Sequence, residues 1–267
     1  MKDAVRRFCW LGLLAPLGCV KPEDPPARDE APAVKRSLEC RWARGRITID
    51  GRINEKVWDD AEKIDNFVVF WQKRKAKSAT TARLLWDDRY LYFSAEMKDE
   101  DLYATVKERN GMTWNDDVFE LFFKPAVTKE GGRRDERALP LQYYEFQVNA
   151  LNTQLELFLP SRGAGGYGRF APLTKLGMES AVRLDGTLND YRDKDRGWSV
   201  EGRIPWTAFK AAGGRPEPGA KWKVALCRYD YSVAFENPEL SSSAPLTLPD
   251  FHRYEDYNEL VFVGPKN

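Results

Sequence analysis

The residues best suited to chemistry in this chain lie together in the segment 113–123. Trp114 precedes two aspartates and a strand-like run that contains a single glutamate, Glu120. A sugar ring presents C–H groups on its faces and hydroxyl groups around its rim, so flat aromatic rings and fixed polar groups can hold it. Trp114 can supply a stacking face and Glu120 a hydrogen-bonding group. The segment therefore indicates a site for a hydroxyl-rich ligand.

The run from Val118 to Phe123 predicts the buried strand that positions Glu120. Its residues are β-branched, aromatic or apolar apart from the glutamate, and Pro125 ends the run. Because side chains alternate along a strand, Glu120 shares a face with Val118 and Phe122. Two interpretations stay open: Glu120 binds a ligand, or it lies at the rim of a sheet and meets water or an arginine.

Further strand-like runs, separated by turn signals such as Asp50-Gly51 and Asp87-Asp88, recur along the chain. Helical patterns are scarce and do not alternate with strands as a parallel α/β sheet requires. The sequence therefore predicts an all-β fold: a two-sheet antiparallel β-sandwich of the jelly-roll or immunoglobulin-like type, with one or two short helices. We expect strands at 38–42, 47–49, 67–71, 81–86, 90–97, 118–124, 143–150, 154–159, 178–184, 198–205, 222–229 and 259–263, short helices at 54–61 and 206–210, and long loops at 125–141 and 160–172.

The first 35 residues predict export. Basic residues precede an apolar run at 8–17 that is too short to span a bilayer, which is typical of a signal peptide over residues 1–18. Leu17-Gly18-Cys19 resembles the bacterial lipobox, so we expect cleavage before Cys19 and lipidation of that cysteine. Residues 19–35 are rich in proline and charge and predict a disordered tether. The chain is then an outer-membrane, cell-surface or periplasmic lipoprotein, with plain secretion as the alternative.

Composition narrows the classes of partner for the remaining domain, residues 36–267. The 42 basic and 41 acidic residues give a net charge of +1, so we expect no nucleic-acid partner and contact with a membrane only through the lipid anchor. With one histidine in the chain, no Cys/His spacing predicts a zinc site. Cys40 and Cys227 remain after export; they could form a disulfide or be two buried thiols.

Five motifs follow one another along the chain. They are Ile49-Asp50-Gly51-Arg52-Ile53-Asn54-Glu55-Lys56-Val57-Trp58, Leu85-Trp86-Asp87-Asp88-Arg89-Tyr90-Leu91-Tyr92, Trp114 to Phe122 with Phe146-Gln147-Val148-Asn149, Trp198 to Trp206, and Phe251 to Leu260. Their order resembles the family 9 carbohydrate-binding modules and the wider DOMON-like sandwiches. The resemblance covers nearly all of residues 45–263. Each motif is weak alone, but five in order are fairly specific for the fold.

The resemblance implies a non-catalytic module that clamps a sugar terminus between two aromatic side chains. These fall on Trp114 and Phe251, with His252 beside the second wall. The implied rim contacts fall on Glu120, Gln147 and Asn149; Gln147 stands where the family has arginine, and Phe251 where it has tryptophan. Family modules are usually appended to catalytic domains, so the resemblance also implies a neighbouring glycan-degrading enzyme and a role in carbohydrate catabolism or surface glycan capture.

No cofactor is expected, although family modules carry structural calcium. Asp116 and Asp117 are the candidate ligands, or they only cap backbone amides. Trp86, Trp198 and Trp222 lie in strand or hairpin patterns that predict core positions.

Three other functions stay open. A surface lipoprotein that contacts protein would have lost the sugar site. A glycoside hydrolase would need paired acids such as Glu120 with Glu145 or Asp117. A b-type haem domain would draw ligands from Met97, Met112, Met178, His252 or lysines.

Overall fold

The computed structural model describes residues 36–125, 142–162 and 166–265 of the chain. The predicted signal peptide, Cys19, the tether and most of the loop at 125–141 lie outside these residues. Within the described part, no helix is long and apolar enough to cross a membrane.

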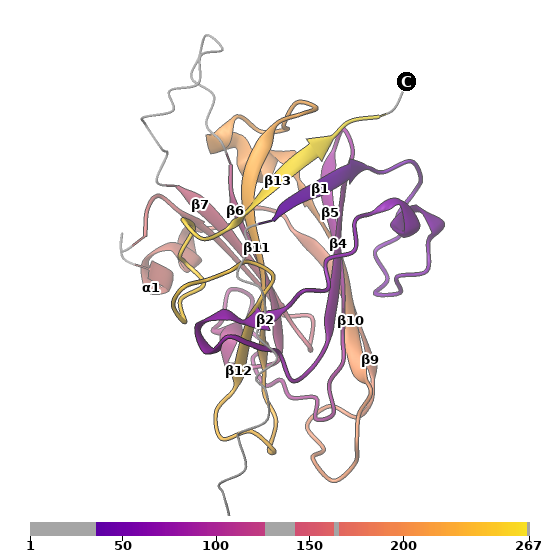
Figure 1. Cartoon of the computed structure of the whole chain (residues 1–267), viewed down its shortest axis with the longest axis vertical. Coiled ribbons are helices and arrows are strands. Elements are labelled where there is room, and N and C mark those ends of the chain that lie inside the picture. The colour runs from indigo at the N-terminus through magenta and orange to yellow at the C-terminus, as the bar shows by residue number, and fades with distance from the viewer. Residues whose placement is uncertain (1–35, 126–141, 163–165, 266–267) are drawn as a thin grey trace, which may run out of the picture.

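Thirteen strands of the described chain are joined by hydrogen bonds and fold into two layers (Figure 1). One layer has the order β9-β10-β5-β4. The other is built on β8-β7-β6-β11, extended by β12, β2 and β3 along one half of β11 and by β13 and β1 along the other half. The strands are β1 (Ser37–Trp42), β2 (Val68–Val69), β3 (Arg74–Lys75), β4 (Thr80–Trp86), β5 (Tyr90–Met97), β6 (Val118–Lys124), β7 (Tyr143–Asn149), β8 (Gln154–Leu159), β9 (Glu179–Asp185), β10 (Gly197–Pro205), β11 (Lys221–Asp230), β12 (Glu239–Ser242) and β13 (Asn258–Val263).

The predicted β-sandwich is confirmed, with one difference in strand direction. All pairings are antiparallel except those of β1, which runs parallel to both β13 and β4. Leu38 lies opposite Leu260 and Trp42 opposite Trp86, so β1 links the two layers at one end of the sandwich. A parallel pair needs no local turn, so no signal in the sequence marked this pairing.

The main hydrophobic core lies between the layers. Phe119, Leu121 and Phe123 of β6 point into it, as the alternation predicted, and are fully buried. Trp86, Trp198 and Trp222 are also core residues, which confirms their predicted packing role. The rings of Trp86 and Trp222 meet neighbouring aromatic rings edge to face, an arrangement that aromatic pairs prefer.

A second hydrophobic cluster covers the outer face of β6, β7, β8 and β11. Leu155, Leu157 and Cys227 contribute from the strands, and the segment 244–257 between β12 and β13 packs over them. The helix α1 (Gly166–Phe170) and a 3-10 helix (Ala171–Leu173) close one side. The prediction of an unbroken loop at 160–172 was therefore wrong, and this face is partly roofed.

Several smaller expectations also differ from the structure. Residues 47–49 form no strand; Ile47 and Ile49 instead pack with Trp58 in a separate small cluster. The predicted helices at 54–61 and 206–210 are 3-10 helices, Lys56–Asp60 and Trp206–Ala212. Strand β12 was missed because its sequence, Glu-Leu-Ser-Ser, carries no apolar alternation.

Candidate functional site

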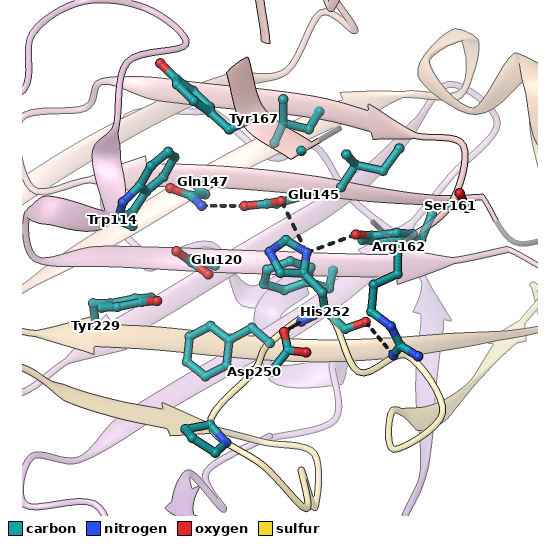
Figure 2. Close-up of a pocket in the computed structure, with 17 residues that line it drawn as sticks. Trp114, Glu120, Glu145, Gln147, Ser161, Arg162, Tyr167, Tyr229, Asp250 and His252 are labelled. Carbon is teal, nitrogen blue, oxygen red and sulfur yellow. Dashed lines mark hydrogen bonds and ion pairs between the residues drawn. The ribbon is translucent and has the colours of Figure 1, made fainter. Parts of the chain in front are cut away.

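A cleft of about 500 Å³ opens on the outer face of β6, β7 and β11, beneath the segment 249–252 (Figure 2). Five of the six side chains that the sequence predicted for ligand contact line it: Trp114, Glu120, Gln147, Phe251 and His252. The remaining lining residues are Phe122, Tyr143, Glu145, Leu157, Leu159, Ser161, Arg162, Gly166, Tyr167, Tyr229, Pro249 and Asp250.

Strand alternation places the polar groups of the cleft. Because Phe119 and Leu121 point into the core, Glu120 between them points outward. On β7, Phe146 points inward, so Glu145 and Gln147 point outward. Glu120 and Gln147 are direct partners across the β6–β7 pair. The strands thus bring two carboxylates and one amide to the middle of the cleft (Figure 2).

Both carboxylates are buried and incompletely bonded. Glu120 is 1% exposed and Glu145 is 3% exposed, and among the described residues neither Glu120 Oε1 nor Glu145 Oε2 has a hydrogen-bond partner. Burial raises the pKa of Glu120 well above its ordinary value, and the nearby Glu145 charge raises it further. Burial also raises the pKa of Glu145, while His252 and the Gln147 hydrogen bond act in the opposite direction.

Gln147 is held by two protein contacts. Its Oε1 accepts a hydrogen bond of 2.5 Å from Thr113 Oγ1, and its Nε2 donates one of 2.5 Å to Glu145 Oε1. One amide N–H stays available for a ligand. Gln147 therefore fixes the Glu145 carboxylate and ties the strand to the segment that carries Trp114.

His252 reaches the carboxylates from the roof of the cleft. Its Nδ1 lies 3.0 Å from the Tyr143 hydroxyl and 3.9 Å from Glu145 Oε2. Its ring also packs edge-on against Phe122, and its backbone N–H donates to Asp250 Oδ1. His252 thus borders the polar centre of the cleft on the side of Tyr143 and Glu145.

The aromatic side chains of the cleft differ in how free they are to stack on a ligand. Trp114 is partly exposed and meets Tyr167 edge to face at 4.7 Å between ring centroids. Phe251 is only 5% exposed, and its ring packs edge to face against Phe122 and Tyr229. Phe251 therefore lies in the lining, but most of its surface is already covered.

Trp114 and the partly exposed Tyr229 lie at one end of the cleft, with Ser161 and Arg162 toward the other (Figure 2). The position of Trp114 is fixed by its backbone, since its carbonyl accepts a hydrogen bond from the Tyr231 hydroxyl.

Asn149 does not line the cleft, contrary to its predicted contact. Its amide donates to Val106 O and Asp116 Oδ2, and its Oδ1 accepts from the backbone N–H groups of Leu151 and Thr153. Asn149 is the last residue of β7, so its side chain bonds the turn that follows. All of its groups serve the fold.

Asp116 and Asp117, the candidate calcium ligands, bond backbone amides. Asp116 accepts from the N–H groups of Thr105 and Val106, and Asp117 from those of Tyr103 and Tyr231. These contacts favour the capping interpretation.

Asp117 also lies with Asp99 and Asp230 in a group whose carboxylate oxygens are within 4.8 Å of one another. Arg228 Nη2 contacts Asp99 at 2.8 Å and Asp230 at 3.0 Å. The guanidinium already supplies positive charge to this group, so the residues fit a buried ion network better than a calcium site.

Cys40 and Cys227 are both free and buried. Cys40 belongs to the core between the layers and Cys227 to the cluster on the outer face. Of the two states that the sequence left open, the structure has two separate thiols.

The haem ligand set is not brought together in the described chain. Met97 and Met178 are core residues, whereas His252 lies in the cleft, which no methionine lines.

Sequence reasoning assigned no ligand contact to Tyr229, Tyr167 or Arg162, and named Glu145 only as a hydrolase acid. Alternation could have placed Glu145 beside Gln147 and Tyr229 beyond Cys227 on the same face. Tyr167 and Arg162 lie in a glycine-rich segment without periodicity, so no comparable signal marks them.

Comparisons with known proteins agree on the type of domain. Residues 49–154 match the family model described as carbohydrate family 9 binding domain-like. Over 167 residues, 62% of this chain, the sequence is 29% identical to endo-1,4-beta-xylanase A of Thermotoga maritima and 28% identical to that of Thermotoga neapolitana. The match spans 13% of the length of each xylanase.

Solved structures share the fold. A candidate carbohydrate-binding protein of Bacteroides uniformis superposes with a TM-score of 0.67 at 20% identity, covering 86% of this chain and 100% of that one. A family 9 carbohydrate-binding module of Caldicellulosiruptor kristjanssonii in complex with cellotriose gives a TM-score of 0.56 at 17% identity, covering 87% and 96%. A family 9 module of the same organism in complex with glucose gives 0.52 at 16% identity, covering 86% and 97%. Residues 49–154 are therefore similar to family 9 carbohydrate-binding domains, and the chain shares the fold of their solved structures.

Proposed function

We propose that this chain is a non-catalytic carbohydrate-binding protein that holds a sugar end in the cleft of Trp114, Glu120 and Glu145. The observation that carries the proposal is the arrangement of the cleft: partly exposed aromatic rings stand beside two buried carboxylates, each with one oxygen that has no hydrogen-bond partner among the described residues. Rings can stack on the C–H faces of a sugar, and carboxylate oxygens accept hydrogen bonds from its hydroxyl groups.

Binding of this kind accounts for the buried carboxylates. A buried polar group without a hydrogen bond costs free energy. Glu120 Oε1 and Glu145 Oε2 carry that cost in the unliganded cleft. Sugar hydroxyl groups that enter would satisfy these oxygens, and the rings would shield the new hydrogen bonds from water.

The comparisons support the same class of ligand. Modules of this fold are known in complex with cellotriose and with glucose. The two curated relatives are much longer xylanases, of which the matched region is a small part. We propose that the chain works beside a glycan-degrading enzyme, which supplies chain ends for the cleft.

Isothermal titration calorimetry with a panel of mono- and oligosaccharides, with free and reduced ends, tests the proposal. Binding should be saturable, and Trp114→Ala should abolish it. Trp71→Ala is the matched control, because Trp71 is a partly buried tryptophan of the same outer cluster that does not line the cleft. Heat changes equal in both variants, or absent across the panel, would contradict the proposal and favour a protein-binding surface domain. Release of reducing ends during the titration would favour a hydrolase.

We further propose that the protein is exported and anchored through lipid on Cys19, on the strength of the apolar run at 8–17 and the Leu17-Gly18-Cys19 motif. Expressed in a Gram-negative host, the full chain should incorporate labelled palmitate and fractionate with membranes. Cys19→Ser should lose the label; retention of the label in that variant would contradict the assignment.

A further inference from the structure

The polar centre of the cleft is rich in carboxyl groups. Glu120, Glu145 and Asp250 contribute three carboxyl groups to the lining. Glu120 Oε1 and Glu145 Oε2 are buried without hydrogen-bond partners among the described residues, and both side chains are at least 97% buried. These two oxygens can therefore accept hydrogen bonds from a ligand.

The two basic side chains that line the cleft are engaged elsewhere or reach only one carboxylate. Arg162 makes two hydrogen bonds to Glu255, of 2.6 and 2.8 Å, at the rim. His252 Nδ1 lies 3.9 Å from Glu145 Oε2 and is shared with the Tyr143 hydroxyl at 3.0 Å.

No cationic side chain is paired in register with Glu120. Its partners across the neighbouring strands are Gln147 on β7 and Cys227 on β11. The Gln147 amide bonds Thr113 and Glu145 instead of Glu120. A ligand that brings its own positive charge would therefore complete this site better than a neutral one.

We propose that the cleft selects a sugar end that carries a protonated amino group, a 2-amino-2-deoxy sugar, over the corresponding neutral sugar. This inference rests on the proposed carbohydrate-binding function. An ammonium group offers three N–H donors and a full charge, enough to serve both Glu120 and Glu145, whereas a hydroxyl group offers one donor and no charge. The aromatic rings accept the apolar face of either sugar, so they do not decide between the two.

A matched pair of ligands tests the selectivity. Fully deacetylated chitotriose and cellotriose have the same β-1,4 linkage and differ only in the group at carbon 2, and N-acetylated chitotriose keeps the nitrogen without its charge. Titration calorimetry on the full chain, at a pH below the pKa of the sugar ammonium group, should give a dissociation constant about tenfold lower for the deacetylated trimer, as expected for a charge-assisted hydrogen bond. Glu120→Gln and Glu145→Gln should each bring the ratio of the two constants toward one.

Two controls separate the cleft from general attraction between a polycation and an acidic surface. Glu96→Gln removes an exposed carboxylate on β5, in the other layer, and should leave the ratio unchanged. Added salt should also leave most of the ratio intact, because buried charges are screened less than exposed ones.

Cellotriose binding as tightly as the deacetylated trimer, or a preference that persists in Glu145→Gln and Glu120→Gln, would overturn the inference while leaving carbohydrate binding in place. Absence of binding by all three trimers would overturn both.

Discussion

Glu120 and Gln147 face each other across β6 and β7, yet the Gln147 amide bonds Thr113 and Glu145, and Glu120 Oε1 has no hydrogen-bond partner in the described part of the chain. A cross-strand pair of this kind usually places two side chains within reach of each other. Here Gln147 holds the Glu145 carboxylate in place and makes no hydrogen bond to Glu120. The chemistry of the cleft follows from this asymmetry.

Replacing Gln147 with arginine should place a cation at the centre of the cleft. A guanidinium at this position can form a bidentate pair with Glu120 or Glu145 and lower the pKa of both. We expect Gln147→Arg to lower the ratio of the dissociation constants of cellotriose and deacetylated chitotriose by about tenfold or more, which removes the preference for the amino sugar. Gln147→Lys, which supplies the charge without the planar fork, should have a smaller effect. Calorimetry with deacetylated chitotriose and cellotriose measures both, and an unchanged preference in Gln147→Arg would contradict this account of the site.

Trp114→Ala should cost less than about 1.5 kcal/mol of the free energy of unfolding, because the indole is partly exposed and its main ring contact is Tyr167. Trp222→Ala is the contrasting variant: Trp222 is 4% exposed and packs on Phe262 and Phe209, so we expect a loss of about 3–5 kcal/mol. Urea unfolding followed by circular dichroism measures both. A similar loss in the two variants would make Trp114 a packing residue and remove it from the site.

Glu120→Gln should make the fold more stable at mildly alkaline pH. Since the pKa of Glu120 is raised in the folded state, the folded protein holds the proton more tightly than the unfolded chain does. The stability that this proton contributes is complete below the ordinary pKa of glutamate and is lost as pH rises through the folded pKa.

Glutamine has no proton to lose, so we expect the Tm of the wild type to fall with pH more steeply than that of Glu120→Gln. Differential scanning calorimetry between acidic and alkaline buffers measures the slopes, with Glu96→Gln as the exposed control. Equal slopes in wild type and Glu120→Gln would show that Glu120 is not the titrating group.

The sequence correctly predicted side-chain orientation where the alternation within a single strand determines it. The alternation in Val118–Phe123 correctly oriented Glu120, and Trp198 and Trp222 were correctly assigned to the core. It failed where distant segments decide the outcome. The parallel pairing of Leu38 with Leu260 depends on two segments more than 200 residues apart. The covering of Phe251 depends on the path of 244–257 over the sheet.

Asn149 shows the same limit at the level of a single side chain. The resemblance to family 9 modules implied a ligand contact for Asn149, but the end of the strand and the neighbouring Asp116 give its amide other partners. Register identifies the face of a sheet, whereas the partners of a polar group depend on loops whose course the sequence pattern does not reveal.

Arg228→Met should be among the most destabilising single substitutions in the described chain. Arg228 is 1% exposed and is the cation in contact with Asp99 and Asp230, so its loss leaves buried carboxylates without a counter-charge, at a cost of about 3–5 kcal/mol. The loss in the free energy of unfolding of Arg228→Met should be smaller at acidic pH. Burial raises the pKa of Asp99 to about 6 even with Arg228 present, and removing the guanidinium raises it further, so protonation relieves the variant over a wider range of pH.

The same variant tests the alternative of a structural calcium ion. With Arg228 present, a chelator should leave the Tm unchanged, because the guanidinium already neutralises the carboxylate group. In Arg228→Met, added calcium should raise the Tm, since Asp99, Asp117 and Asp230 then offer oxygens within 4.8 Å of one another without the competing guanidinium. Arg83→Met, which breaks an exposed ion pair with Glu96, is the control and should show neither effect. A chelator that lowers the Tm of the wild type would show that a metal ion, and not Arg228 alone, balances the charge of this group.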